Sequence, residues 1–95
     1  MIIYEVNIQI NAKIYDIFLS WLNSHAAEML EFDGFKKYDI YKNKKNPLSL
    51  TVHYYIENIS YLENYLKDYA KDMRLKGKKE FQDQISIDRR VLLKL

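Results

Sequence analysis

The chain has 95 residues, of which 48% are hydrophobic and 29% charged, and its formal net charge at pH 7 is +2. This composition is too hydrophobic for a disordered chain, and the length suits one small globular domain over residues 1–95. The sequence has no cysteine, which excludes a disulfide scaffold and a thiolate metal site, and we therefore expect a cytoplasmic protein.

The first third of the chain changes from strand periodicity to helix periodicity. Residues 2–10 carry apolar side chains at every second position, which predicts a strand with one core face. Asn11 offers an oxygen that can cap a helix beginning at residue 12, and we expect this helix to end at Gly34, because glycine most readily adopts a left-handed conformation. His25 lies near the centre of the apolar stripe of this helix, which consists of Ile14, Ile17, Phe18, Trp21, Leu22 and Met29.

The middle of the chain predicts a hairpin. Residues 35–42 carry charges on both faces, which is typical of an edge strand where lysine discourages pairing with foreign strands. Residues 43–47, "NKKNP", predict a turn. Residues 48–57, "LSLTVHYYIE", alternate again and predict a strand with one apolar face.

The last third of the chain predicts a second helix and a final strand. The segment "SYLE" matches a capping box, in which Ser60 caps the helix and Glu63 reaches back to it. Residues 85–93 alternate between apolar and polar positions and predict the final strand. The stripe of the second helix weakens near Gly77 and consists of Leu62, Tyr65, Leu66, Tyr69 and Met73.

The order of the predicted elements is strand, helix, strand, strand, helix, strand. Residues 2–10 and 48–57 are the most regular strands, so we expect them to be the central pair. Right-handed crossovers place both helices on one face of the sheet. The sequence therefore predicts an α+β, ferredoxin-like βαββαβ fold, with a four-stranded antiparallel sheet in the spatial order 4-1-3-2.

The second face of this sheet has no predicted helix to cover it. Two interpretations remain open: a solvated face, which is common in antiparallel sheets, or a face that packs on its own copy across a two-fold axis. We favour the homodimer, because a small domain gains buried surface in this way. An unpaired charge buried there costs on the order of 3–5 kcal/mol, so a tight dimer requires its charges to be paired. The candidate dimer residues are Ile3, Glu5, His53, Tyr55, Arg90 and Leu92.

The helix-covered side offers three candidate pocket residues. His25 is either a core histidine bonded to a tyrosine, a carbonyl or Glu28, or a base or ligand in a cleft, and the first interpretation is favoured. Arg89 either packs its aliphatic carbons on the core and leaves its guanidinium in water, or binds an anion at the entrance of a pocket. Tyr54 is expected to be a core aromatic with its hydroxyl near the rim.

Several partner classes find little support. The two histidines point to opposite sheet faces, so we predict no metal site and no cofactor. Lysines crowd the second strand and the end of the second helix, but the open face lacks the stacked aromatics of RNA-binding sheets, so we do not expect nucleic acid as a partner. No apolar stretch approaches the roughly 20 residues that cross a membrane.

Four segments together resemble a known group of proteins. They are "MIIYEVNIQI", "WLNSHAAEML" leading to "GF", "LTVHYYIE" and "RRVLLKL". The chain resembles a small family of bacterial domains of unknown function within the dimeric α/β-barrel superfamily. This resemblance implies a ferredoxin-like subunit and a dimer whose two sheets form a barrel. The superfamily includes cofactor-free monooxygenases, haem-degrading enzymes and isomerases, as well as members without demonstrated activity.

The leading hypothesis is therefore a homodimeric ferredoxin-like domain of unassigned activity that binds a small hydrophobic ligand. The alternative is a cofactor-free monooxygenase or isomerase that uses His25 with Tyr54 or Arg89 in an apolar cleft. A basic nucleic-acid-binding module is the third hypothesis. The sequence leaves open whether the protein is an enzyme.

Overall fold

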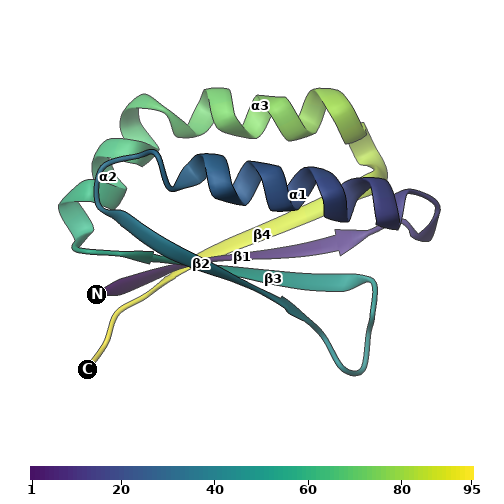
Figure 1. Cartoon of the computed structure of the whole chain (residues 1–95), viewed down its shortest axis with the longest axis horizontal. Coiled ribbons are helices and arrows are strands. Elements are labelled where there is room, and N and C mark those ends of the chain that lie inside the picture. Colours follow the sequence, from purple (N-terminus) through teal and green to yellow (C-terminus); the bar gives the residue numbers. More distant parts are fainter.

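The computed structural model describes residues 1–95 and contains one four-stranded antiparallel sheet with its helices on one face (Figure 1). The strands are β1 (Ile2–Ile10), β2 (Phe35–Lys42), β3 (Ser49–Ile56) and β4 (Ile85–Leu92), and their spatial order is β2-β3-β1-β4. This is the predicted order read from the opposite edge, so the ferredoxin-like fold is confirmed. The helices are α1 (Tyr15–Met29), α2 (Ile59–Asp68) and α3 (Ala70–Phe81), with 3-10 turns at Ala12–Ile14 and Gln82–Gln84.

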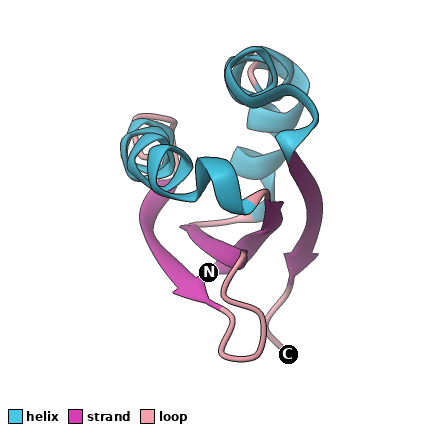
Figure 2. Ribbon diagram, turned by 90° about the vertical axis from the view of Figure 1, so that its right-hand side faces the viewer, coloured by secondary structure: helices cyan, strands magenta, loops and turns pink.

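The alternation of β1 divides its side chains between two environments. Tyr4, Val6 and Ile8 are buried against the helices, which lie together above the sheet (Figure 2). Glu5 points to the opposite face, where the register places it across from His53 on β3 and from Arg90 on β4. As expected, β1 and β3 are the central strands, and their regular pattern reflects neighbours on both edges.

The first helix ends earlier than predicted. α1 stops at Met29, where the N–H groups of Leu30 and Glu31 each donate to the carbonyl three residues earlier, so the chain tightens into three-residue turns. Gly34 does have the expected left-handed conformation, with φ of 83°, but it lies in the turn that enters β2. Ile17, which was assigned to the apolar stripe, is 65% exposed, so the buried face of α1 is narrower than the sequence suggested.

The second helix differs from the prediction in its start and its continuity. Asn58, not Ser60, is the N-cap, and its side chain accepts hydrogen bonds from the N–H groups of Ser60 and Tyr61. The helix breaks at Tyr69, whose backbone angles of −127° and −26° are not helical, and α3 continues as far as Phe81. Two residues of the predicted stripe, Leu66 and Tyr69, are exposed.

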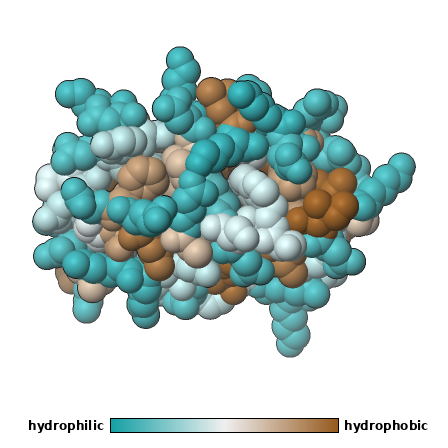
Figure 3. Space-filling model, turned by 45° about the horizontal axis from the view of Figure 1, so that its top comes forward, coloured by the Kyte–Doolittle hydropathy of each residue, from teal (hydrophilic) through white to brown (hydrophobic).

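The outer surface of the helices is mainly hydrophilic, with isolated apolar patches between the charged side chains (Figure 3). None of the helices combines the length and the apolar character that a membrane crossing requires.

Candidate functional site

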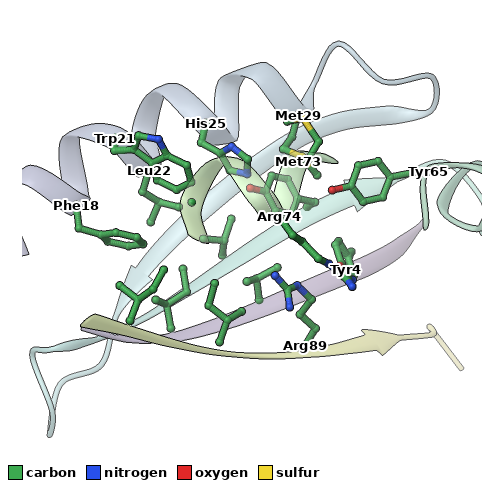
Figure 4. Close-up of a pocket in the computed structure, with 17 residues that line it drawn as sticks. Tyr4, Phe18, Trp21, Leu22, His25, Met29, Tyr65, Met73, Arg74 and Arg89 are labelled. Carbon is green, nitrogen blue, oxygen red and sulfur yellow. Dashed lines mark hydrogen bonds between the residues drawn. The ribbon is translucent and has the colours of Figure 1, made fainter. Parts of the chain in front are cut away.

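A cavity of about 60 Å³ lies between α1, α3 and the helix-facing side of the sheet. Its volume exceeds the roughly 10–15 Å³ that a single water molecule needs, and it is smaller than the roughly 300 Å³ of a typical ligand pocket. Most of its lining is apolar, and Figure 4 shows the side chains that point into it. The lining residues are Tyr4, Val6, Ile8, Phe18, Trp21, Leu22, His25, Met29, Val52, Tyr54, Tyr65, Met73, Arg74, Gly77, Ile85, Ile87 and Arg89.

His25 lies on the α1 wall of this cavity. Its ring stacks on Trp21, with the centroids 4.5 Å apart and the planes inclined by 12°. The Nδ1 atom is buried and has no hydrogen-bond partner, so the expected bond to a tyrosine, a carbonyl or Glu28 is not formed through it. Burial lowers the pKa of His25 below 6.5, and Glu28 only partly opposes this effect. The neutral imidazole is thus the form favoured near pH 7.

Glu28 does not reach the imidazole because it pairs with Lys76 instead. This ion pair joins α1 to α3 across the helical layer, and its two side chains are about half exposed. Lys76 in turn adds a positive charge near His25 and lowers the histidine pKa further. The residue that the sequence offered as a partner for His25 therefore supports the packing of the two helices.

Two arginines stand on the other side of the cavity. Arg89 is half-buried on the helix-facing side of β4, and its side chain takes part in no hydrogen bond or ion pair within the chain. Burial lowers its pKa. Arg74 of α3 donates a hydrogen bond to the hydroxyl of Tyr4, with a nitrogen–oxygen distance of 3.1 Å. No carboxylate lines the cavity, so its charged groups are all cationic.

The structure brings the three candidate pocket residues of the sequence around this one space. His25, Tyr54 and Arg89 come from α1, β3 and β4 respectively. Tyr54 is 2% exposed, and burial raises the pKa of its hydroxyl. Arg74 was not among the candidate residues, because it lies in the basic segment at the end of the second predicted helix. Arg74 follows Ala70 by four residues and lies beside Met73 on α3, but nothing in the sequence indicates that a new helix begins at Ala70.

The open face of the sheet carries a polar network centred on Glu5. The Glu5 carboxylate is bonded by Arg90, by Asn7 at 3.0 Å and by His53 at 2.8 Å. Its side chain is only 7% exposed, because these neighbours cover it although no helix does. The Arg90 hydrogen bond is the main reason that the pKa of Glu5 falls to about 2. Thr51 extends the network by donating to Asn7 at 2.6 Å.

One end of the same face is apolar. A shallow groove runs there between β1, β3 and the C-terminal end of β4. Its lining contains three candidate dimer residues and consists of Met1, Ile3, Tyr55, Leu92, Leu93 and Lys94. The open face thus combines an ion-paired centre with an apolar end. No three histidine, aspartate or glutamate side chains of the chain lie close enough together to hold a metal ion.

The fold and the covered cavity define a ferredoxin-like α+β protein with a buried candidate site on the helical side of its sheet. The chain belongs to the family described as domain of unknown function DUF4286, whose model matches residues 1–95. No curated protein matches the sequence.

Solved structures share the fold at low sequence identity. SnoaB from Streptomyces nogalater, described as a cofactor-independent oxygenase, is 10% identical, with a TM-score of 0.77 over 99% of this chain and 92% of its own. A Deinococcus radiodurans protein provisionally described as an antibiotic biosynthesis monooxygenase is 12% identical, with a TM-score of 0.80 over 100% and 93%. A conserved protein from Methanosarcina mazei is 20% identical, with a TM-score of 0.66 over 95% and 91%. At these identities the similarity establishes the fold.

Proposed function

We propose that residues 1–95 form one ferredoxin-like domain that binds a small hydrophobic molecule in the cavity between its helices and its sheet. The observation that carries this proposal is His25, a residue that lines the cavity and whose buried Nδ1 atom has no hydrogen-bond partner. A buried polar atom without a partner costs about 1–3 kcal/mol. A ligand that fills the cavity and bonds to this nitrogen offsets that cost. The predominantly apolar lining supplies the remaining contacts.

Trp21 provides a direct test of ligand binding, because it is the only tryptophan and lines the cavity. We expect benzyl alcohol to change its fluorescence saturably at millimolar concentrations. The variant Ile87→Phe narrows the cavity from β4 and should weaken this binding several-fold. Ile59→Phe is the matched control, since Ile59 is exposed at the start of α2 and outside the cavity. A strictly linear fluorescence response, unchanged by Ile87→Phe, would contradict the proposal.

We also propose that the protein works as a homodimer through its open sheet face, in the cytoplasm of a bacterial cell. The face supports a two-fold contact because it carries both Glu5 and Arg90 and has an apolar end at Leu92. Light scattering during size-exclusion chromatography should give twice the monomer mass. Leu92→Arg should yield a monomer, whereas Leu66→Arg, on the exposed surface of α2, should not. A monomeric wild-type protein at micromolar concentration would refute the dimer.

A second candidate function is a cofactor-free monooxygenase or isomerase. The observation that favours it is that burial keeps His25 neutral near pH 7, so its imidazole can accept a proton from a phenol or enol held in the cavity. The fold similarity to a cofactor-independent oxygenase makes oxygen the first co-substrate to test. We expect oxygen consumption with 1,2,4-trihydroxybenzene above the rate without protein, and its loss in His25→Gln. Equal rates for wild type and variant would argue against this function.

A further inference from the structure

Arg89 presents a positive charge to the cavity without any negative charge to balance it. Its guanidinium is half-buried, and the titratable groups that influence it are Arg74 and the hydroxyls of three tyrosines. None of these is an anion near pH 7. The one nearby acid on α1, Glu28, is paired with Lys76.

The second arginine leaves the same region still more positive. Arg74 uses one nitrogen to bond the Tyr4 hydroxyl at 3.1 Å, and it has no carboxylate partner. Withdrawing a guanidinium from water without a counter-ion is unfavourable. Because no carboxylate lines the cavity, an anion from outside is the group that would complete the site. A guanidinium matches the two oxygens of a carboxylate better than it matches any neutral group.

The cavity also has two chemically different ends. Phe18 and Trp21 lie together at one end, with ring centroids 5.7 Å apart, and Figure 4 shows Arg74 and Arg89 toward the other end. A molecule with an apolar body and a charged head therefore fits in one orientation. The body contacts the aromatic end, and the head lies between β4 and α3.

We propose that the ligand of this cavity is a small aromatic or aliphatic carboxylate, whose carboxylate pairs with Arg89 and Arg74 while its apolar body packs on Trp21. This proposal names the ligand class of the function proposed above and rests on it. His25 lies between the two ends and contributes its unpartnered Nδ1 atom as a third polar contact.

The size of the cavity limits the ligand to about one ring. An apolar cavity of about 150 Å³ holds benzene, so a space of about 60 Å³ must widen to admit a ring. The α3 wall can provide this space, because Met73 is a flexible side chain and Arg74 is an exposed one. Single-ring compounds are therefore the appropriate probes.

Benzoate and benzamide separate charge from shape, since they are nearly isosteric and only benzoate is anionic. We expect titrations followed by Trp21 fluorescence to show that benzoate binds about tenfold more tightly than benzamide. The difference comes from the charge-assisted hydrogen bonds that only the carboxylate forms. In Arg89→Met this preference should disappear, with benzamide affinity little changed. Lys79→Met removes one positive charge from the exposed surface of α3 and should keep the preference. If Arg89→Met does not fold, Arg74→Met, which alters an exposed side chain, should reduce the preference in its place.

The outcomes distinguish the two proposals. Equal binding of benzoate and benzamide would overturn the carboxylate proposal and leave ligand binding in the cavity intact. Saturable binding of neither benzoate, benzamide nor benzyl alcohol would overturn ligand binding itself. A benzoate preference that survives in Arg89→Met and Arg74→Met together would place the anion elsewhere on the protein and would also refute the proposal.

Discussion

The imidazole of His25 lies nearly parallel to the indole of Trp21, with 4.5 Å between the ring centroids. This contact makes the tryptophan a reporter of the histidine charge, because a protonated imidazole quenches a neighbouring indole. We predict that fluorescence falls as the pH is lowered, with a midpoint below 6.5, since burial lowers the pKa of His25. His25→Gln should abolish the transition. His53→Gln, on the opposite face of the sheet, should leave it unchanged, and a midpoint at or above 6.5 would contradict burial of the ring.

The same lowered pKa has a consequence for stability. Above pH 6.5, His25 is largely neutral in both the folded and the unfolded chain, so its contribution is fully present. Below that pH the unfolded chain binds a proton more readily than the folded one, and the free energy of unfolding falls until the folded-state pKa has been passed. Urea titrations at intervals of pH should show this loss in the wild type. In His25→Gln the free energy of unfolding should depend less steeply on pH below 6.5. If the pH dependence is the same as in the wild type, groups other than His25 cause the loss.

Glu5 affects the stability of the fold in a different, more acidic pH range. Its pKa falls from 4.5 to about 2 on folding, chiefly through the Arg90 hydrogen bond, so its stabilisation is present above pH 4.5 and is lost as the pH falls toward 2. The sheet face is open to solvent, which reduces the expected effect to about 1–2 kcal/mol. Glu5→Gln should lower the free energy of unfolding by this amount at pH 7. It should also reduce the further loss of stability as the pH falls from 4.5 toward 2. Asp88→Asn is the matched control, because Asp88 forms no ion pair. Equal effects of the two variants would contradict a special role for Glu5.

The positions of the strands could be predicted because the apolar periodicity of each one is determined by which face it buries. The same periodicity placed Glu5, His53 and Arg90 on one face, and the observed register brings them into contact. Helix ends were less predictable, because two neighbouring polar residues, Asn58 and Ser60, can each act as a cap and only tertiary packing selects one.

The candidate site was only partly predictable for a related reason. His25 and Arg89 could be singled out because each is a polar residue within an apolar stripe. Arg74 could not, because the break at Tyr69 changes the rotation of α3 relative to α2, and this rotation decides which residues face the cavity. The pairing of Glu28 with Lys76, 48 residues apart, likewise depends on helix packing that local sequence does not encode.

The choice of cap at the start of α2 can be tested directly. Asn58→Ala removes the oxygen that accepts from two backbone N–H groups, and we expect it to cost about 1 kcal/mol. Ser60→Ala removes only a hydroxyl that donates to Asn58, and we expect a cost of about half that or less. Chemical denaturation of both variants measures the difference. A larger loss of stability in Ser60→Ala than in Asn58→Ala would show that Ser60 is the N-cap, as the capping box predicts.

The turn that enters β2 depends on a contact between Gly34 and Tyr61. A Cβ atom on residue 34 would lie 2.3 Å from Cγ of Tyr61 and 2.6 Å from its Cβ, and the φ of 83° disfavours any side chain. Rotation of the ring cannot relieve the second clash, so the backbone must move. We therefore expect Gly34→Ala to cost about 2–4 kcal/mol, combining backbone strain with overpacking.

A double-mutant cycle separates these two contributions. Tyr61→Gly removes both clashing atoms, whereas Tyr61→Ala would keep the Cβ atom that lies 2.6 Å away. In the Tyr61→Gly background, Gly34→Ala should cost only the strain of the left-handed conformation, about 1–2 kcal/mol. Urea titrations of the four proteins measure the coupling. Additive costs would mean that Tyr61 does not press on this turn, and that conformation alone requires glycine at position 34.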